Sequence, residues 1–531
     1  MPARLLFAAA LFTLLLSLLA GCGPGGGSTS PDTLIYSRGT DADTLDPLDT
    51  TLGETVTVLV NLYDTLVTYD DETLEIVPSL AEKWEVSEDK LTWVFHIRPG
   101  VKFHDGTVCD AAAIEFNLRR FLDPEPEFLL GVGRPYREAF DRVASVKAVE
   151  ENRLEITLTE PDVFLLENLA MFPAGVVSPK SIREAKSKAD LAVRGIGTGP
   201  FKLESWSRDE RLVLAANPDH WRGPPGVSRV VFLPVPENAV RAQQIVRGEA
   251  HITDNLPPTE IAAIEDKPGV AVQRQVGMNV GYLTTQLEKP PLDQLKVREA
   301  IWRSIDKQRR VDTAYSGPGR TAVSIVPPTV PGWDADLVDR TYDPAEAKRL
   351  LEEAAAEQGF TLPLKLNLFF MKQPRPYMQQ PQQIAVFLRD ALAPIGIELT
   401  LVLRASQQHF QRLSRGEHDL ALAGWSSDNG TADNFLHSLL DEANISDDGG
   451  NNVSRWRNSR FHDLLVAARS ELDEAKRNEL YRQAQQLAFS EAPVIPLVHT
   501  NVQIALRDQV EGYKLHPSSL VRLRGAKLSE R

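Results

Sequence analysis

The most constraining feature of the sequence is a strand–helix–strand pattern between residues 364 and 403. Leucines alternate along residues 364–368, and apolar residues alternate again along 397–403. A period of two residues is typical of a β-strand. Between them, apolar residues in 384–392 recur every three to four positions, as on the buried face of a helix. This order predicts two parallel strands joined by a right-handed helical crossover.

Similar patterns extend over the rest of the chain. Asp343 is expected to cap a helix, with Pro344 in the first turn, Glu346 completing a capping box and Gly359 ending the helix. Other strands are expected at residues 91–97, 154–158 and 418–425. Strands that alternate with helices predict an α/β fold.

Composition narrows the class of protein. The chain has 531 residues, with 58 Lys and Arg against 73 Asp and Glu, and a net charge of −15. This length predicts two to four domains or lobes. The acidic balance argues against a nucleic-acid-binding protein, which needs a basic surface for phosphates. The two cysteines are Cys22 and Cys109, and Cys22 falls in a targeting segment, so no intrachain disulfide is expected.

The N-terminus has the features of an export signal. A single early positive charge precedes an apolar run from Leu5 to Ala20, which is shorter than the roughly 20 residues that span a bilayer. The run ends in Leu19-Ala20-Gly21-Cys22, which resembles a bacterial lipobox, in which Cys22 would carry a diacylglycerol. Residues 23–31 are rich in glycine and serine and predict a flexible tether. The globular body is therefore expected outside the cytoplasm, anchored to a membrane through Cys22.

Two charged residues follow predicted parallel strands. Arg375 comes after the strand ending near residue 370, and Asp428 comes after the strand ending near residue 425. In open α/β sheets, ligands bind beyond the carboxyl ends of the strands. One cation and one anion at the same rim match a zwitterion, such as a dipeptide with its charges about 7 Å apart. The alternatives are that Arg375 is a solvated loop cation and that 428–430 is an ordinary turn.

Several motifs together resemble the peptide/nickel-binding family of extracytoplasmic solute-binding proteins, which feed ABC importers. The similarity covers nearly all of the mature chain. The matching segments are Leu80-Ala81-Glu82-Lys83-Trp84-Glu85-Val86-Ser87, Gly100-Val101-Lys102-Phe103-His104-Asp105-Gly106, Gly197-Thr198-Gly199-Pro200-Phe201-Lys202-Leu203, Asn217-Pro218-Asp219-His220-Trp221, Asn279-Val280-Gly281-Tyr282 and Tyr342-Asp343-Pro344.

Within this family, the segments 424–435 and 375–377 look most like dipeptide-binding proteins. The resemblance implies that Asp428 pairs with the peptide ammonium and Arg375 with its carboxylate. It further implies a ligand-binding role for Trp425, Asn279, Gly281 and Tyr282. No catalytic residue, metal or cofactor is expected.

The resemblance also implies a two-lobed, class II periplasmic-binding-protein (Venus-flytrap) fold with an extra subdomain in the first lobe. The partners would be a di- or oligopeptide and an ABC permease, and we expect a monomer that binds no nucleic acid. The alternatives are the same fold with another cargo (a nickel chelate, haem, an opine or a sugar derivative), a receptor without a permease, and an exported peptide hydrolase.

The expected segments are a lipoprotein signal peptide (1–21), a lipid-anchored tether (22–31), lobe I (32–277, with its subdomain at about 65–195), lobe II (278–496) and a C-terminal return to lobe I (497–531).

Overall fold

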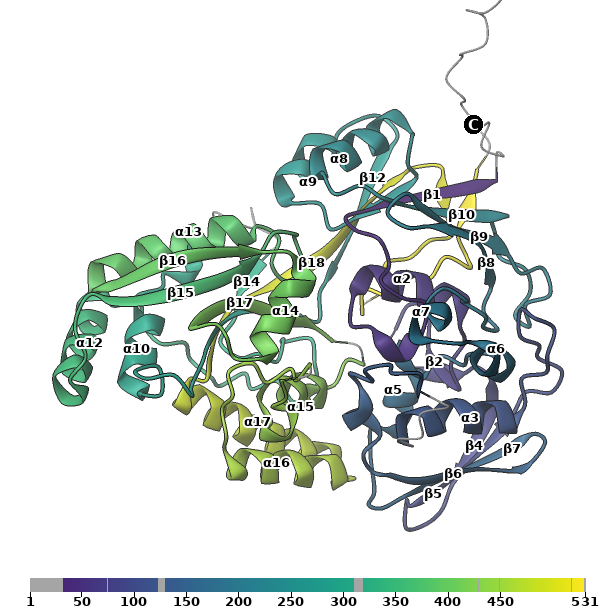
Figure 1. The fold of residues 1–531 in the computed structure, drawn as a ribbon, viewed down its shortest axis with the longest axis horizontal. Helices are drawn as coiled ribbons and strands as arrows, with labels where there is room; N and C mark the ends of the chain where they lie inside the picture. The colour runs from purple at the N-terminus through teal and green to yellow at the C-terminus, as the bar shows by residue number, and fades with distance from the viewer. Residues whose placement is uncertain are drawn as a thin grey trace, which may run out of the picture.

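The computed structural model describes residues 32–73, 75–122, 129–309, 319–427, 429–447, 449–516 and 518–529. The predicted signal peptide, tether and lipidation site Cys22 lie outside the described residues, as does Asp428. The described chain forms an α/β protein of two lobes, as predicted (Figure 1). Within the part described, no helix is long and apolar enough to cross a membrane.

The first lobe is built on one end of a long mixed sheet. Strand β1 (Thr33–Arg38) pairs in parallel with β10 (Arg229–Pro234) and β11 (Ile252–Asp254), and β9 (Arg211–Ala216) and β8 (Phe201–Ser207) continue the sheet in antiparallel order. Its helices are α2 (Gly53–Leu62), α6 (Pro179–Glu184), α7 (Lys188–Leu191), α8 (Asn238–Arg247) and α9 (Pro258–Ile264). Because β1 and β11 are parallel, the loop after β1 and Asp254 lie at the same rim.

A subdomain packs against this lobe. Its antiparallel sheet has the order β4 (Ala81–Val86), β5 (Thr92–Ile97), β7 (Arg153–Leu158) and β6 (Val143–Glu150). The predicted strands at 91–97 and 154–158 correspond to β5 and β7, whose inward residues share a core with α3 (Ala111–Leu122) and α5 (Leu165–Ala170). A short hairpin of β2 (Val67–Tyr69) and β3 (Ile76–Pro78) adjoins it. Cys109 is a free thiol buried in this core.

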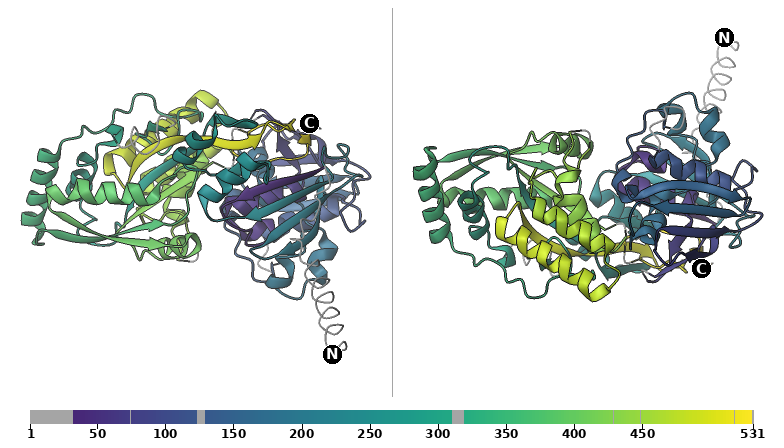
Figure 2. Two further views of the ribbon diagram at one scale, coloured as in Figure 1. Left: turned by 90° about the horizontal axis from the view of Figure 1, so that it is seen from above. Right: turned by 90° about the horizontal axis from the view of Figure 1, so that it is seen from below.

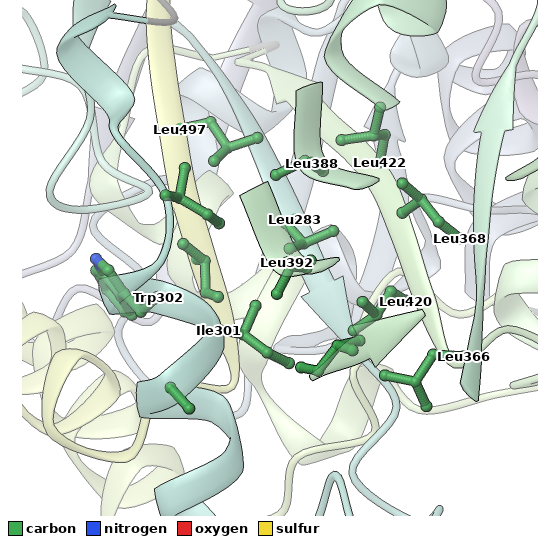
Figure 3. Packing of buried hydrophobic residues seen from close by; sticks show 14 of the residues in the cluster. Leu283, Ile301, Trp302, Leu366, Leu368, Leu388, Leu392, Leu420, Leu422 and Leu497 are labelled. Carbon is green, nitrogen blue, oxygen red and sulfur yellow. The ribbon is translucent and has the colours of Figure 1, made fainter. Parts of the chain in front are cut away.

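The second lobe contains the predicted strand–helix–strand unit. Strand β15 (Leu364–Met371) pairs in parallel with both β16 (Ile397–Arg404) and β17 (Leu420–Ser426), and β17 pairs antiparallel with β13 (Asn279–Thr285). One face of this sheet packs on α10 (Leu295–Arg303), α12 (Pro344–Gln358) and α13 (Pro381–Leu392). Figure 3 shows leucines of the sheet and of α13 meeting Ile301 of α10 in that core.

Helix α12 begins and ends where the sequence predicted. The Asp343 side chain accepts hydrogen bonds from the backbone N–H groups of Ala345 and Glu346, and Gly359 ends the helix in the left-handed conformation. The prediction that Glu346 completes a capping box is wrong. The Asp343 N–H donates to the Arg303 carbonyl rather than to the Glu346 side chain, which pairs with Arg349 instead.

The other face of the second lobe's sheet is covered by a helical layer. Its core includes residues of α15 (Ala432–Leu440), α16 (Ser459–Ser470) and α17 (Glu474–Glu491). The short helix α14 (Ser406–Ser414) lies between β16 and β17 in the chain. In the views of Figures 1 and 2, α15 to α17 lie on the side of this lobe that faces the first lobe's subdomain.

Two segments cross between the lobes. One leads from β12 (Val270–Val276) into β13, and the other is strand β18 (Val494–Arg507). The first half of β18 pairs with β13 and β14 (Gly319–Thr321), and its second half pairs with β12 and β11. Figure 1 shows β18, in yellow, running from one lobe into the other. Beyond it, the C-terminal segment packs into the first lobe's core and ends in a two-stranded sheet of β19 (Val510–Glu511) and β20 (Lys527–Leu528).

Candidate ligand-binding cleft

A cavity of about 900 Å³ lies between the lobes and is lined by both. This volume falls in the range of roughly 300–1,000 Å³ that is typical of small-molecule sites. The first lobe contributes the loop after β1, the first turn of α2, Asp254 and residues of the C-terminal segment. The second lobe contributes the loop after β15, the end of β17 and α14. We refer to this cavity as the cleft.

Arg375 lies in the cleft and bridges the two lobes. Its loop turns tightly, because Arg375 and Met378 exchange two backbone hydrogen bonds of 3.1 and 2.9 Å. The residue is only 6% exposed, and its Nη1 donates to Oε2 of Glu54 at 2.8 Å. Glu54 is 4% exposed and stands in the first turn of α2, where the helix dipole favours a negative charge. Arg375 is therefore not a solvated loop cation.

Burial and charge act in opposite directions on this ion pair. Burial alone would raise the pKa of Glu54, but Arg375, a backbone hydrogen bond and Arg38 together hold that pKa below its ordinary value. Burial alone would likewise lower the pKa of Arg375, and the nearby carboxylate of Glu54 raises it overall. Both groups are thus charged at neutral pH, and each needs the other while the cleft is closed.

A second carboxylate lies next to Glu54. Asp254, at the end of β11, lines the cleft, and its Oδ2 accepts a hydrogen bond of 2.9 Å from the hydroxyl of Tyr36. Burial, and then the negative charge of Glu54, raise the pKa of Asp254 to about 6. Behind the wall, Arg38 donates to the Glu54 carbonyl at 2.6 Å and to Asp41 at 3.0 Å. Neither Glu54 nor Asp254 was predicted from the sequence, because no local motif marks them.

The end of β17 and Ser427, which follows it, line the cleft. Asp428 itself lies outside the described residues, so its place at this rim stays a prediction. Trp425 lines the cleft, and its indole N–H donates to Oδ1 of Asn434 at 2.8 Å, which fixes the ring. Tyr282 is buried and also lines the cavity.

Gly281 and Gly424 allow a close approach to Tyr377, which follows Arg375 in the chain. A Cβ at Gly281 would lie 2.4 Å from the Tyr377 carbonyl oxygen, and one at Gly424 would lie 2.2 Å from its ring. No real Cβ atom tolerates such distances, so both positions need glycine for the Arg375 loop to lie against β13 and β17. Gly281 thus supports the wall of the cleft rather than lining it.

Asn279 lies at the crossing between the lobes and outside the residues that line the cleft. Its side chain accepts from the Thr500 N–H at 3.0 Å and donates to the Thr500 carbonyl at 3.0 Å. Because Asn279 begins β13 and Thr500 lies in the middle of β18, these bonds tie the two crossing segments together. The geometry gives Asn279 a structural part at the crossing.

The lobes also meet on the side formed by the subdomain and α15 to α17, in a contact that we call the clasp. Arg469 of α16 pairs with Asp141 at 3.0 Å and with Asp162 at 3.6 Å. Arg142 donates to the Val466 carbonyl and to the Ser470 hydroxyl, each at 3.0 Å. Further clasp contacts join Phe164 to Tyr481 and Asn168 to Asn429.

The family-like motifs of the first lobe converge on Asp64. Its Oδ2 accepts from the hydroxyl of Thr198 and the indole N–H of Trp221, both at 2.9 Å, and lies 3.4 Å from Nε2 of His220. His104 bonds to the backbone of Gly199 nearby. The Thr198 hydroxyl donates to the carboxylate rather than to the histidine, so this trio does not form a nucleophile–base pair. These motifs hold the lobe together and do not line the cleft.

The described residues contain no group of three or more His, Cys, Asp and Glu side chains that could hold a metal ion.

Comparison with known proteins gives a consistent result. The family model described as "Bacterial extracellular solute-binding proteins, family 5 Middle" matches residues 75–447. A dipeptide-binding protein from Escherichia coli is 33% identical over 511 residues, which cover 92% of this chain and 93% of that protein. Heme-binding protein A from Haemophilus influenzae is 32% identical over 470 residues, covering 86% and 85%.

A solved structure shares the fold. The dipeptide-binding protein of a Pseudoalteromonas species, in complex with Met-Leu, aligns with a TM-score of 0.88 and 27% identity over 94% of this chain and all of that one. The chain belongs to family 5 of the bacterial extracellular solute-binding proteins, a family of transport components. The predicted family and two-lobed α/β fold are confirmed.

Proposed function

We propose that this protein captures di- or oligopeptides between its lobes and delivers them to an ABC permease. The observation that carries the proposal is the buried guanidinium of Arg375 in a cleft that both lobes line. Similarity to dipeptide-binding proteins over more than nine-tenths of the chain favours a peptide cargo. Arg375 would bind the peptide carboxylate, since its planar fork matches a carboxylate. Asp428 would bind the ammonium.

Closure of the lobes would retain the peptide. In the open form the ligand would contact one lobe, and in the closed form both, so binding would favour closure by that difference in affinity. Trp425 and Tyr282 would contribute apolar wall to the closed site. The permease would then recognise the closed monomer, which would be tethered to a membrane through lipidated Cys22.

A different cargo in the same fold is the main competing possibility, because a heme-binding protein is among the similar relatives. Mass spectrometry of the ligand released from purified, denatured protein distinguishes the two. Peptides in the released fraction support the proposal, and a porphyrin or a metal chelate would replace it.

Asp428→Asn tests the ammonium assignment. The amide keeps the shape but loses the charge, so dipeptide affinity should fall by about 2 kcal/mol, or roughly 30-fold. Isothermal calorimetry with a dipeptide measures this change, and Asp390→Asn, at an exposed surface ion pair with Arg389 and away from the cleft, serves as the control. Unchanged affinity in Asp428→Asn would remove Asp428 from the site.

A further inference from the structure

The charged groups that interact with Glu54 and Asp254 form a balanced set. Among the described residues, this set comprises three carboxylates and three guanidiniums, namely Asp41, Glu54 and Asp254 with Arg38, Arg241 and Arg375. Arg38 pairs with Asp41, Arg375 pairs with Glu54, and Arg241 stabilises the charge on Asp254 from behind the wall. A peptide without a charged side chain would still bring its C-terminal carboxylate, which would be a fourth negative charge in this set.

The Glu54–Arg375 pair makes that addition costly. Under the proposed function, the peptide carboxylate binds Arg375, which is the ion-pair partner of Glu54. Glu54 would then share or lose its cation while buried beside Asp254. Two buried carboxylates without enough positive charge are unstable, and the system must gain either a cation or a proton.

We infer that Glu54, together with Asp254, selects peptides whose C-terminal residue carries a basic side chain. The carboxylate of such a residue binds Arg375, and its lysine or arginine side chain replaces the cation that Glu54 gives up. The ion pair between Glu54 and Arg375 is thereby exchanged for two ion pairs with the cargo. This inference rests on the proposed function and adds the cargo's charge class to it.

Cargo without a basic side chain must instead bring a proton to the carboxylate pair. The groups that act on this pair are Tyr36 and Arg38 of β1, Arg241 of α8, Tyr513 of the C-terminal segment, and Arg375 and Tyr377 of the second lobe, and Asp41 pairs with Arg38. Burial raises the pKa of each of these tyrosines, and burial lowers the pKa of nearby His409 to about 4. Near neutral pH, therefore, the proton would go to Asp254 or Glu54, and the pKa of Asp254 is already about 6.

The test compares Ala-Lys with Ala-norleucine by calorimetry, since norleucine keeps the four-carbon chain without the charge. The wild type should bind Ala-Lys at least tenfold more tightly at pH 7.5. Titrations in buffers of different ionisation enthalpy should show proton uptake with Ala-norleucine and none with Ala-Lys. Because protonation accompanies binding, the affinity for Ala-norleucine should rise as pH falls from 7.5 to 6.

Glu54→Gln is the decisive variant, because it removes the competing charge at constant shape. It should bind Ala-norleucine at least tenfold more tightly than the wild type and lose the preference for Ala-Lys. Asp254→Asn should also weaken the preference for Ala-Lys over Ala-norleucine. Glu265→Gln, which breaks a surface pair with Arg274, is the control and should leave both affinities unchanged.

Equal affinity of the wild type for both dipeptides would overturn the inference and leave the proposed function intact. A preference that survives in Glu54→Gln would overturn it as well. Failure of the wild type and of every variant to bind any di- or oligopeptide would instead overturn the proposed function.

Discussion

Arg375→Met is expected to nearly abolish dipeptide binding while leaving the fold intact. The variant removes the partner of the ligand carboxylate and also leaves Glu54 in the closed cleft, beside Asp254, without the cation with which it pairs. Breaking a buried charge pair from one side costs about 3–5 kcal/mol. At 1.4 kcal/mol per tenfold, that corresponds to a loss of affinity of roughly 100- to 4,000-fold.

Calorimetry with a dipeptide measures this loss, and circular dichroism checks the fold. The fold should survive because opening of the lobes, as proposed above, would expose both carboxylates to water. Arg389→Gln, which removes an exposed arginine of α13 paired with Asp390, should bind as the wild type does. Arg375→Lys should recover only part of the affinity, since an ammonium lacks the planar fork. An Arg375→Met variant that binds dipeptide within threefold of the wild type would contradict the assigned role.

Arg469→Met is expected to shift the protein toward the open form. Asp162 is 4% exposed and lies in the clasp. Burial is the main reason that its pKa is raised, and the charge of Arg469 opposes this rise. Without Arg469, closure would bury this carboxylate without its cation, at a cost of roughly 2–3 kcal/mol. The partly exposed Asp141 adds little to this cost, because water screens it. Apparent peptide affinity should fall by about 30- to 150-fold, since only the closed fraction binds fully.

Small-angle X-ray scattering with and without a saturating dipeptide measures the shift. The ligand-free variant should have a larger radius of gyration than the ligand-free wild type, and excess dipeptide should bring the two together. Arg153→Gln removes an exposed pair with Glu150 in the same subdomain and should leave scattering and affinity unchanged. If Arg469→Met scatters and binds like the wild type, the clasp does not contribute to closure.

Local patterns were sufficient to predict most of the second lobe. The period of two in β15 and β16, the helical spacing in α13 and the cap at Asp343 depend only on neighbouring residues, and all appear in the structure. Parallel pairing of β15 with β16 and β17 then follows from chain order, and it carries the Arg375 loop to the cleft. The capping box does not form, because the Arg303 carbonyl accepts from the Asp343 N–H and Arg349 pairs with the Glu346 side chain. Neither contact could be predicted from the residue types at the helix end alone.

The contacts that join the lobes could not be predicted in the same way. Glu54 and Arg375 are 321 residues apart, and Arg469 and Asp141 are 328 apart. Nothing in the local sequence around Glu54 separates it from any other acidic residue in a first helical turn. Such pairs depend on how two lobes approach each other, which local periodicity does not encode. The motif residues around Asp64 were recognised from family resemblance, but their structural purpose became visible only when Thr198 and Trp221 met the same carboxylate.

The most direct test of the central claim compares a free dipeptide with its capped forms. Calorimetry would titrate Ala-Leu, N-acetyl-Ala-Leu and Ala-Leu amide into protein freed of endogenous ligand. If a positive and a negative end of the cargo are each paired inside the closed cleft, the free dipeptide binds and either cap weakens binding by at least 30-fold. Equal binding of all three forms would show that the charges at the two ends are not what the cleft recognises.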